Sequence, residues 1–340
     1  MSALRSRLRS TPPGTTRSRT VFRPRGETAG MDERGALALL DAELEAVGDD
    51  AAVIDGLVVT TDMLHDRTDF PEGTTRYTAG WRSVAASLSD VAAMGATATA
   101  AVAAYAAPAF DREELLAFVR GASDVCEAVD AEYVGGDLDE HQEFTVATTA
   151  IGRTGAGGDG TDPVPRSGAR PGDRVCVTGT LGRSAAALEM FERASDASAG
   201  DSSAADLRER ANDLFRFEPR VAAGRALAPH ATAMMDSSDG LARSLHQLSE
   251  ASDCGFAIDG DRVPIDDAVR DVADDEAAAL ELATTFGEDF ELVATVPEDE
   301  LAAVREAADV PVTEIGTVLE REEGITLDGE PLADEGYTHG

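Results

Sequence analysis

Two short apolar runs that meet at Asp55-Gly56 form the clearest local pattern in the chain. The runs AVI and LVVTT are rich in β-branched residues, and the Asp-Gly pair between them is the strongest short-range signal for a β-hairpin. A two-residue turn at this point pairs Ile54 with Leu57. The pattern therefore predicts two antiparallel strands near the start of the folded part of the chain.

Helical periodicity follows the hairpin. In the segment TAGWRSVAASLSDVAAMGA, the apolar residues Val84, Leu88 and Val91 fall on one stripe, and Gly95 ends the pattern. This spacing predicts a helix that buries one face.

The rest of the chain alternates strands with helices. Asp111 and Glu114 form a capping box that opens a second helix, and a short strand ending at YVGGD and a long strand EFTVATTAIG come next. A strand RVCVTG, a glycine-containing turn and a helix from Ser184 then open a second half, which continues in the same alternation to ELVATV and PVTEIGTV. The predicted fold class is α/β, in two halves of similar size.

The same patterns divide the chain into four segments. Residues 1–30 hold seven arginines and a single acid with no apolar periodicity, which predicts a disordered arm rather than a targeting segment; translation starting at Met31 is the alternative. We assign 31–152 to an N-terminal domain, 153–172 to a linker rich in Gly and Pro, and 173–340 to a C-terminal domain.

Composition and charge exclude several classes of protein. Asp and Glu total 65 against 29 for Lys and Arg, a formal net charge of −36, and none of the basic residues is a lysine. A chain with this charge lacks the excess of Lys and Arg with which proteins bind the phosphates of DNA or RNA. The absence of lysine excludes Walker-type P-loops, protein-kinase folds and Schiff-base chemistry.

The acid excess has two explanations. In a salt-rich cytoplasm, such as that of a halophilic archaeon, like charges are tolerated because the Debye length falls to ~3 Å at molar salt. The other explanation is a cluster of metal-binding carboxylates. Most of the 65 acids belong to the first class, so a lone Asp carries little information and only Asp in an unusual local setting counts.

Two features bear on where the protein is found. The uncharged stretch 91–110 is long enough to span a bilayer, but it is mostly Ala, Thr and Gly, so we interpret it as a helix end, a turn and a buried strand over 99–105. Three scattered cysteines form neither a disulfide framework nor a zinc site, which fits a reducing cytoplasm. We therefore expect a cytoplasmic protein that does not contact a membrane.

The hairpin register brings acids face to face. If pairing continues beyond the turn, Asp50 lies opposite Thr61 and Asp49 lies opposite Asp62. Like charges directly across a sheet are destabilising. Either a divalent cation lies between these carboxylates, since hard cations bind carboxylate and hydroxyl oxygens, or the strands separate earlier and water lies between the charges.

Two further acids stand in unusual settings. Ser83, Ser87, Asp90 and Met94 share one face of the expected first helix; a solvated face is the ordinary explanation of such a stripe, and a binding site is the alternative. The segment 135–137, Gly-Gly-Asp, places an acid after a strand on a flexible loop where a ligand can approach the backbone.

A denser cluster stands at residues 236–239, Asp-Ser-Ser-Asp, where a helix with a leucine stripe is expected to begin. Two acids and two serines exceed what the capping of one helix requires. A site for a metal ion and a phosphate would use the surplus. Without lysine, Mg²⁺ and arginine are the groups that can neutralise the charge of a transferring phosphoryl group.

Seven segments resemble thiamine-monophosphate kinases and occur in the same order as in that family. They are VGDDAAVI, TTDM, SLSDVAAMGA, GGD, RSGARPGDRVCVTGTLGRSAAAL, DSSDGL and GEDFEL. The resemblance runs from about residue 46 to the end. It implies a two-domain, synthetase-like ATP-binding fold whose N-terminal domain contributes strands to a barrel shared by a homodimer.

The resemblance also implies an activity and a set of site residues. The γ-phosphate of ATP would pass directly to thiamine phosphate, giving thiamine diphosphate and ADP, with several Mg²⁺ ions and no covalent nucleophile on the protein. The family pattern implies metal ligation by Asp50, Thr60, Thr61, Asp62, Asp90, Asp137, Asp236 and Asp239, ATP contacts by Gly136, Asp137, Arg166 and Ser238, and substrate contacts by Asp69, Glu288 and Tyr337. Asp69 lies in TTDMLHDRTDF, where relatives commonly read TTDMLVEGVHF, so it replaces a substrate-contacting His.

Two other functions remain open at this point. Aminoimidazole ribonucleotide synthetase belongs to the same superfamily, and assays on both substrates separate the two enzymes. A non-catalytic acidic protein that binds Mg²⁺ or Ca²⁺ belongs to another class, and it would show no thermal shift with ATP.

Overall fold

The structure is a computed structural model in which the chain divides into two units, 1–45 and 46–340, and every described residue belongs to the second unit. The predicted arm over 1–30 and the predicted substrate residue Tyr337 lie outside the described residues. The described ranges are 48–155, 160–197 and 203–336.

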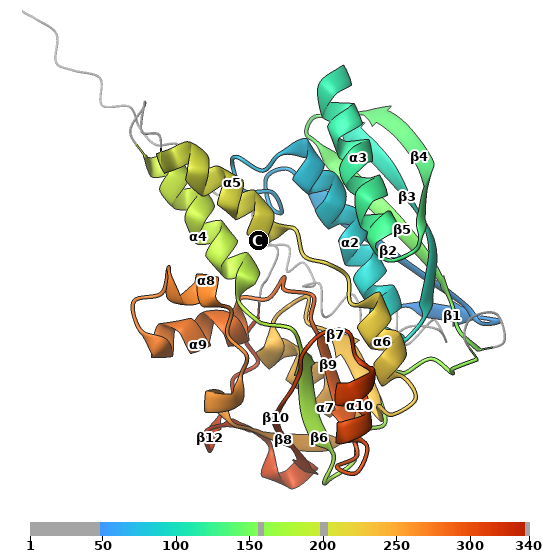
Figure 1. The fold of residues 1–340 in the computed structure, drawn as a ribbon, viewed down its shortest axis with the longest axis vertical. Helices are drawn as coiled ribbons and strands as arrows, with labels where there is room; N and C mark the ends of the chain where they lie inside the picture. Colours follow the sequence, from blue (N-terminus) through green and yellow to red (C-terminus); the bar gives the residue numbers. More distant parts are fainter. Residues whose placement is uncertain (1–47, 156–159, 198–202, 337–340) are drawn as a thin grey trace, which may run out of the picture. The chain divides into compact units, whose positions relative to one another are not determined.

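The first half of the described chain is a five-stranded sheet with two helices lying across one face (Figure 1). The strand order is β1-β2-β5-β3-β4, in which β3 and β4 run parallel and the other neighbours antiparallel. Helix α3 makes the crossover that a parallel pair requires. The elements are β1 (Ala52–Ile54), β2 (Leu57–His65), α2 (Arg76–Ala93), β3 (Thr97–Ala107), α3 (Arg112–Ala128), β4 (Glu132–Glu140) and β5 (Thr145–Arg153).

The predicted hairpin is confirmed, but its predicted extension is wrong. Ile54 pairs with Leu57 as expected, and the ladder ends at the pair Ala52 and Val59. Residues 48–50 form a bend outside the strand, so Asp49 and Asp50 do not face Thr61 and Asp62 across the sheet. The two acids turn instead to Arg166, whose backbone and guanidinium groups satisfy their carboxylates better than a facing acid would.

The predicted first helix is α2, and its apolar stripe is confirmed. Val84, Leu88 and Val91 are completely buried between the sheet and the second half of the chain. Thr75 caps the helix by accepting a hydrogen bond from the Thr78 N–H, and Gly95 follows its end with a φ of +63°, a conformation that favours glycine.

The capping box predicted for α3 is half formed. The Asp111 carboxylate accepts hydrogen bonds from the backbone N–H groups of Glu113 and Glu114, as an N-cap should. The Glu114 side chain does not complete the box; it pairs with Arg76 on α2 at 3.0 Å and so ties the two helices together.

The segment 135–137 was expected on a loop, and that prediction is wrong. Gly135, Gly136 and Asp137 lie inside β4, which runs on to Glu140 at the edge of the sheet. The ladder between β3 and β4 shifts register here, and a Cβ on Gly136 would lie 1.7 Å from the Ala103 carbonyl oxygen. The glycines therefore allow two backbones to approach closely within a continuous strand.

The second half is built on a seven-stranded sheet of order β12-β11-β8-β10-β6-β9-β7. All its neighbouring strands are antiparallel except β11 and β8. The strands are β6 (Arg174–Thr178), β7 (Ala233–Asp236), β8 (Cys254–Ile258), β9 (Leu292–Val296), β10 (Val312–Glu320), β11 (Ile325–Leu327) and β12 (Glu330–Pro331).

Helices accompany this sheet, and α4 begins at Arg183, which confirms the helix predicted from Ser184. Figure 1 shows α4 and α5 side by side and α8 and α9 close together in the sequence-coloured ribbon. The helices are α4 (Arg183–Asp196), α5 (Ser203–Phe215), α6 (Val221–Leu227), α7 (Leu241–Ser252), α8 (Asp267–Arg270), α9 (Glu276–Thr285) and α10 (Leu301–Ala307). Short 3₁₀ turns lie at η2 (Gly260–Arg262) and η3 (Arg321–Glu323).

Helix α2 joins the two halves. It packs on the first sheet and also against β7, α5 and α6 of the second half. The uncharged stretch 91–110 is the end of α2, a turn and strand β3, as predicted. Within the described ranges, no helix is both long and apolar enough to cross a membrane.

Candidate active site

Three carboxylates from distant parts of the chain meet where the halves join. Asp50 precedes β1, Asp90 lies on α2 and Asp236 is the last residue of β7. One carboxylate oxygen of each lies within 4.8 Å of the other two. Asp236 is 1% exposed, so the cluster reaches into the interior of the protein.

Strand β2 adds two groups to this acid cluster. Because side chains alternate along a strand, Thr60 and Asp62 both point toward α2. The Thr60 hydroxyl donates to the Asp90 carboxylate, and the Asp62 carboxylate accepts from the Ser87 hydroxyl. Asp62 also interacts electrostatically with Asp90 and Asp236.

Serines on α2 hold the acids in place. Ser87 contacts both Asp62 and Thr148 of β5, and Ser89 donates to the Asp236 carboxylate at 2.6 Å. Both serines are completely buried. The polar stripe predicted on this helix therefore faces the acid cluster, and the alternative of a solvated face is wrong.

Arg166 supplies the positive charge at one side of the cluster. Its Nη2 and Nε atoms donate to the two oxygens of Asp50 at 2.8 and 3.3 Å, and its backbone N–H donates to Asp49 at 2.8 Å. The Asp50 side chain is 1% exposed, so this ion pair is largely removed from water. The predicted metal ligand Asp50 and the predicted ATP contact Arg166 are thus direct neighbours.

Burial raises the pKa of all four carboxyl groups, and repulsion by the other acids of the cluster adds to this for Asp90 and Asp236. The pKa of Asp236 is raised to about 8, mainly by burial and then by the charge of Asp50, against the lowering effect of the hydrogen bond from Ser89. Burial and then the charges of Asp62, Asp236 and Asp50 raise the pKa of Asp90 well above its ordinary value. Burial also raises the pKa of Asp50 and of Asp62, against the lowering effect of Arg166 and of Ser87 respectively.

The donor set suits a hard divalent cation. Three carboxylates converge, the Thr60 hydroxyl contacts one of them and Asp62 lies close enough to repel two of them. Among the described residues, one arginine hydrogen-bonds to this cluster. Mg²⁺ prefers carboxylate, hydroxyl and water oxygens, and one such ion would offset the repulsion that raises these pKa values. The residues present therefore fit Mg²⁺.

The segment 236–239 is arranged differently from the prediction. It was expected at the start of a helix, but Asp236 ends β7 and α7 begins only at Leu241. Gly240 is the N-cap residue and makes no side-chain cap, so the acids do not serve the helix. The Ser238 carbonyl accepts a hydrogen bond from the Glu288 N–H, and Asp239 lies half-buried beside Gly287.

Three predicted site residues lie away from the acid cluster within a single chain. Thr61 points to the opposite face of the sheet, where its hydroxyl donates to the Thr148 carbonyl at 2.8 Å. Gly136 and Asp137 lie on β4, and β4 is three strand positions from β2, a separation of ~14 Å. Asp137 pairs with Ala104, and both are exposed.

The two described substrate candidates line one cavity. Asp69 and Glu288 both border a hollow of about 180 Å³, together with Phe70, Phe215 and Phe286. Asp69 is buried, and its carboxylate accepts hydrogen bonds from the His65 N–H at the end of β2 and from the Thr68 hydroxyl. Glu288 interacts electrostatically with Asp62, so the cavity adjoins the acid cluster.

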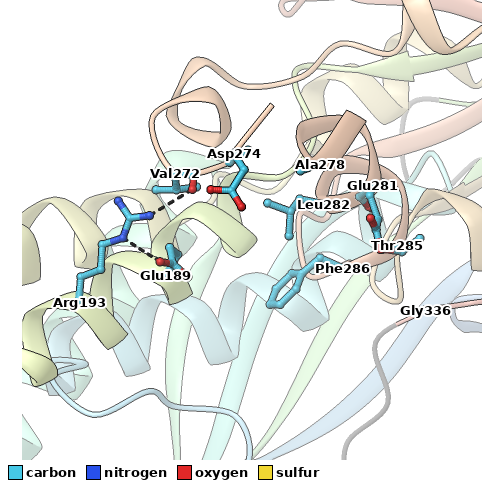
Figure 2. Close-up of a pocket in the computed structure, with 11 residues that line it drawn as sticks. Glu189, Arg193, Val272, Asp274, Ala278, Glu281, Leu282, Thr285, Phe286 and Gly336 are labelled. Carbon is cyan, nitrogen blue, oxygen red and sulfur yellow. Dashed lines mark hydrogen bonds and ion pairs between the residues drawn. The ribbon is translucent and has the colours of Figure 1, made fainter. Parts of the chain in front are cut away.

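A larger hollow of about 680 Å³ lies between α4 and α9, and Phe286 lines both cavities. Figure 2 shows apolar side chains such as Leu282 and Phe286 alongside the acids Asp274 and Glu281. Arg193 crosses its edge and donates to Glu189 and to the Val272 carbonyl. The sequence singled out none of these residues, because they carry no motif and come together only through packing.

Comparisons with known proteins match almost the whole described chain. The AIR synthase related protein N-terminal domain matches residues 48–154, and the corresponding C-terminal domain matches 170–328. The thiamine-monophosphate kinase of Halobacterium salinarum is 61% identical over 309 residues, which cover 91% of this chain and 100% of that protein. The chain belongs to the thiamine-monophosphate kinase family.

Solved structures agree with this membership. AaThiL in complex with AMPPCP and TMP superposes with a TM-score of 0.77 at 27% identity, over 91% of this chain and 97% of that one. The thiamine-monophosphate kinase from Stenotrophomonas maltophilia K279a has a TM-score of 0.72 at 31% identity, over 88% and 96% of the two chains. The predicted α/β fold in two halves is confirmed, and the Halobacterium relative fits the predicted salt-adapted composition.

In this member of the thiamine-monophosphate kinase family, sequence reasoning missed Ser89 and Arg82. Ser89 lies one residue outside the polar stripe of α2, on the side that meets β7. Arg82 lies on the same helix, and its side chain is almost completely buried. A charged residue on the buried side of a predicted helix is the signal that would have pointed to Arg82.

Proposed function

We propose that this protein transfers the γ-phosphate of ATP to thiamine phosphate, giving thiamine diphosphate and ADP. The observation that carries the proposal is the buried acid cluster of Asp50, Asp90 and Asp236 adjoining a cavity lined by Asp69 and Glu288. The identity of 61% to a curated thiamine-monophosphate kinase supports the same function.

Mg²⁺ belongs to this proposal. Asp50, Asp90 and Asp236 would hold the ion, with Asp62 and Thr60 next to them. When bound, Mg²⁺ supplies positive charge that stabilises a transferring phosphoryl group. The chain's own contribution is to hold these oxygens together before any ligand arrives, through the serines of α2 and the Asp50–Arg166 ion pair.

The ATP side of the proposed site is built around Arg166 and Ser238. Arg166 pairs with Asp50 and already lies in a fixed orientation, so it can add positive charge toward the phosphates without reorganising. By family resemblance we also propose Asp239 as a metal contact. Gly136 and Asp137, which lie on β4 away from the acid cluster of their own chain, would complete the ATP and metal contacts only from the second copy of a homodimer.

The acceptor side is the cavity with Asp69 and Glu288, with Tyr337 proposed to pack on thiamine. We propose direct in-line transfer, with the residues positioning the two substrates and no phosphoenzyme. The three cysteines are buried, and burial raises their pKa, to about 12 for Cys126 and Cys176, so they are poor nucleophiles.

We also propose a cytoplasmic homodimer built from the domains 31–152 and 173–340. The face of the first sheet opposite α2 and α3 exposes Met63 at 61% and Val134 at 59%. Exposed apolar side chains on a sheet face favour a partner surface, and a second copy pairing there would cover them.

Steady-state assays with purified protein, ATP, Mg²⁺ and molar KCl test the proposal. Thiamine diphosphate and ADP should form in equal amounts from thiamine phosphate, with no turnover of the substrate of aminoimidazole ribonucleotide synthetase. Incubation with γ-labelled ATP alone should leave no label on the protein. Absence of thiamine diphosphate would refute the activity, and stoichiometric labelling would refute direct transfer.

A further inference from the structure

Arg82 occupies an unusual position for a charged residue. It lies on α2, two helical turns before Asp90, and only 1% of its side chain is exposed. The ring of Phe215 stacks against it, with the guanidinium carbon 3.7 Å from the ring centroid, and the rings of Phe217 and Phe290 lie at 5.4 and 5.5 Å. A buried guanidinium is costly unless its donors are used.

The two terminal nitrogens of Arg82 donate to the second half, to Glu288, Phe215 and Ser184, while Nε has no hydrogen-bond partner among the described residues. Arg82 Nη2 donates to both the Oε2 atom and the backbone carbonyl of Glu288, the latter at 3.1 Å. Nη1 donates to the Phe215 carbonyl at 2.7 Å, which fixes the plane of the guanidinium. Ser184 links the same groups, since its hydroxyl donates to the Glu288 carbonyl at 2.6 Å.

The backbone of Glu288 needs such support. Its φ is +61°, a left-handed conformation that non-glycine residues rarely adopt, and Phe290 has a φ of +55°. Strain of this kind persists only where the surroundings over-determine the conformation, and it is concentrated at functional sites. Arg82, Ser184 and the Ser238 carbonyl are the groups that hold this residue in place.

The charge of Arg82 matters as much as its hydrogen bonds. Glu288 faces the acceptor cavity and interacts with Asp62 of the acid cluster, so its carboxylate would otherwise be pushed away by like charge. Within the described ranges, Arg82 is the arginine whose guanidinium pairs with Glu288, and the hydrogen bond goes to Oε2.

We propose that Arg82 is a positioning residue for the acceptor: it holds the Glu288 carboxylate at the cavity wall, so that Glu288 can orient thiamine phosphate toward the acid cluster. This inference rests on the proposed function. Arg82 does not touch the acceptor itself. Its effect therefore passes through Glu288 and falls on the acceptor KM, while the ATP KM stays nearly constant.

Steady-state kinetics on Arg82→Met, Arg82→Lys, Glu288→Gln and the double variants test this. Arg82→Met should raise the thiamine phosphate KM about tenfold or more, the size expected when one charge-assisted hydrogen bond is lost, with less than a twofold change in the ATP KM. Arg82→Lys, which keeps the charge but not the fork, should recover part of the loss. In the Glu288→Gln background, Arg82→Met should add little, because both changes remove one interaction.

Arg216→Met is the matched control. Arg216 also connects the end of α5 to α2, through Thr78 and the ring of Tyr77, but does not contact Glu288. The substitution Arg216→Met should leave the KM for thiamine phosphate and the KM for ATP unchanged. If Arg82→Met does not fold, the same cycle with Arg82→Lys decides the question, with melting curves as the check on folding.

Two results would overturn the inference. One is an equal rise in both KM values, and the other is full additivity of the Arg82 and Glu288 changes, which would give Arg82 a purely structural role. A wild-type protein that makes no thiamine diphosphate would refute the proposed function instead, so the two failures are distinguishable.

Discussion

The Ser89 hydroxyl on α2 donates a 2.6 Å hydrogen bond to the Asp236 carboxylate at the end of β7, and both residues are buried. This bond joins the two halves of the chain inside the acid cluster. It partly compensates a carboxylate whose pKa burial raises to about 8. The halves are thus held together by the groups that we propose to bind the metal, so catalysis and stability are coupled at this point.

Asp236→Asn should reduce turnover by roughly 10²-fold or more, the order seen when a key electrostatic stabiliser is lost. The amide keeps the size of the side chain and can still accept from Ser89. Melting in the absence of divalent cations should be unchanged near neutral pH, where a carboxyl group with a pKa of about 8 is mostly protonated, and slightly higher at more alkaline pH, where the substitution removes a buried charge. The control is Asp196→Asn at the exposed end of α4, which should behave like wild type. Near-normal turnover in Asp236→Asn would contradict the assignment of this residue.

The stability of the protein should depend on pH differently with and without Mg²⁺. The folded-state pKa of Asp236 is raised to about 8 from an ordinary 3.8, so between these values the folded protein binds more protons than the unfolded chain. Stability without divalent cations should therefore fall as pH rises from about 4 to about 8 and then level off.

Added Mg²⁺ should raise the melting temperature most at the alkaline end, because the ionised carboxylates bind it. Melting curves in EDTA and in Mg²⁺ at constant molar KCl measure this, and an identical slope in both would count against a metal site at the acid cluster.

Arg166→Lys should raise the KM for ATP by roughly tenfold, because lysine keeps the charge but cannot make two parallel hydrogen bonds to Asp50. The KM for thiamine phosphate should change much less, since Arg166 lies on the side of the acid cluster away from the acceptor residues in our proposal. Arg262→Lys is a matched control: Arg262 makes a similar forked pair with Glu314, but in an exposed position. Equal effects of the two substitutions would argue against a specific role for Arg166.

Salt should stabilise the protein. With a formal net charge of −36, self-repulsion is strong at low ionic strength. The melting temperature should rise between ~0.1 M and ~2 M KCl, as the Debye length shrinks from ~10 Å to below 3 Å. A flat or falling curve would remove the salt-adapted explanation of the acid excess.

Local features were predictable from the sequence because local residues determine them. The Asp55-Gly56 hairpin, the stripe of α2 and the Asp111 cap depend on side chains within a few positions of one another, so short patterns were enough. Family membership was likewise carried by short motifs that keep their order along the chain. The acid candidates Asp50, Asp90 and Asp236 came from those motifs, but nothing local showed that they converge.

Tertiary structure alone decided which of the candidates meet. Asp50 and Arg166 are separated by 116 positions and Ser89 and Asp236 by 147, so their contacts depend on how the two sheets dock around α2. Continuing the hairpin pairing beyond the turn predicted Asp50 opposite Thr61. In the structure the ladder ends earlier, and Asp50 pairs with the distant Arg166 instead. The amino-acid sequence by itself determined the local elements and the net charge. Because it contains no lysine, it also excluded the mechanisms that need one. The packing of α2 between the halves determined the site, because burial, repulsion and ion pairing act only once distant residues are in contact.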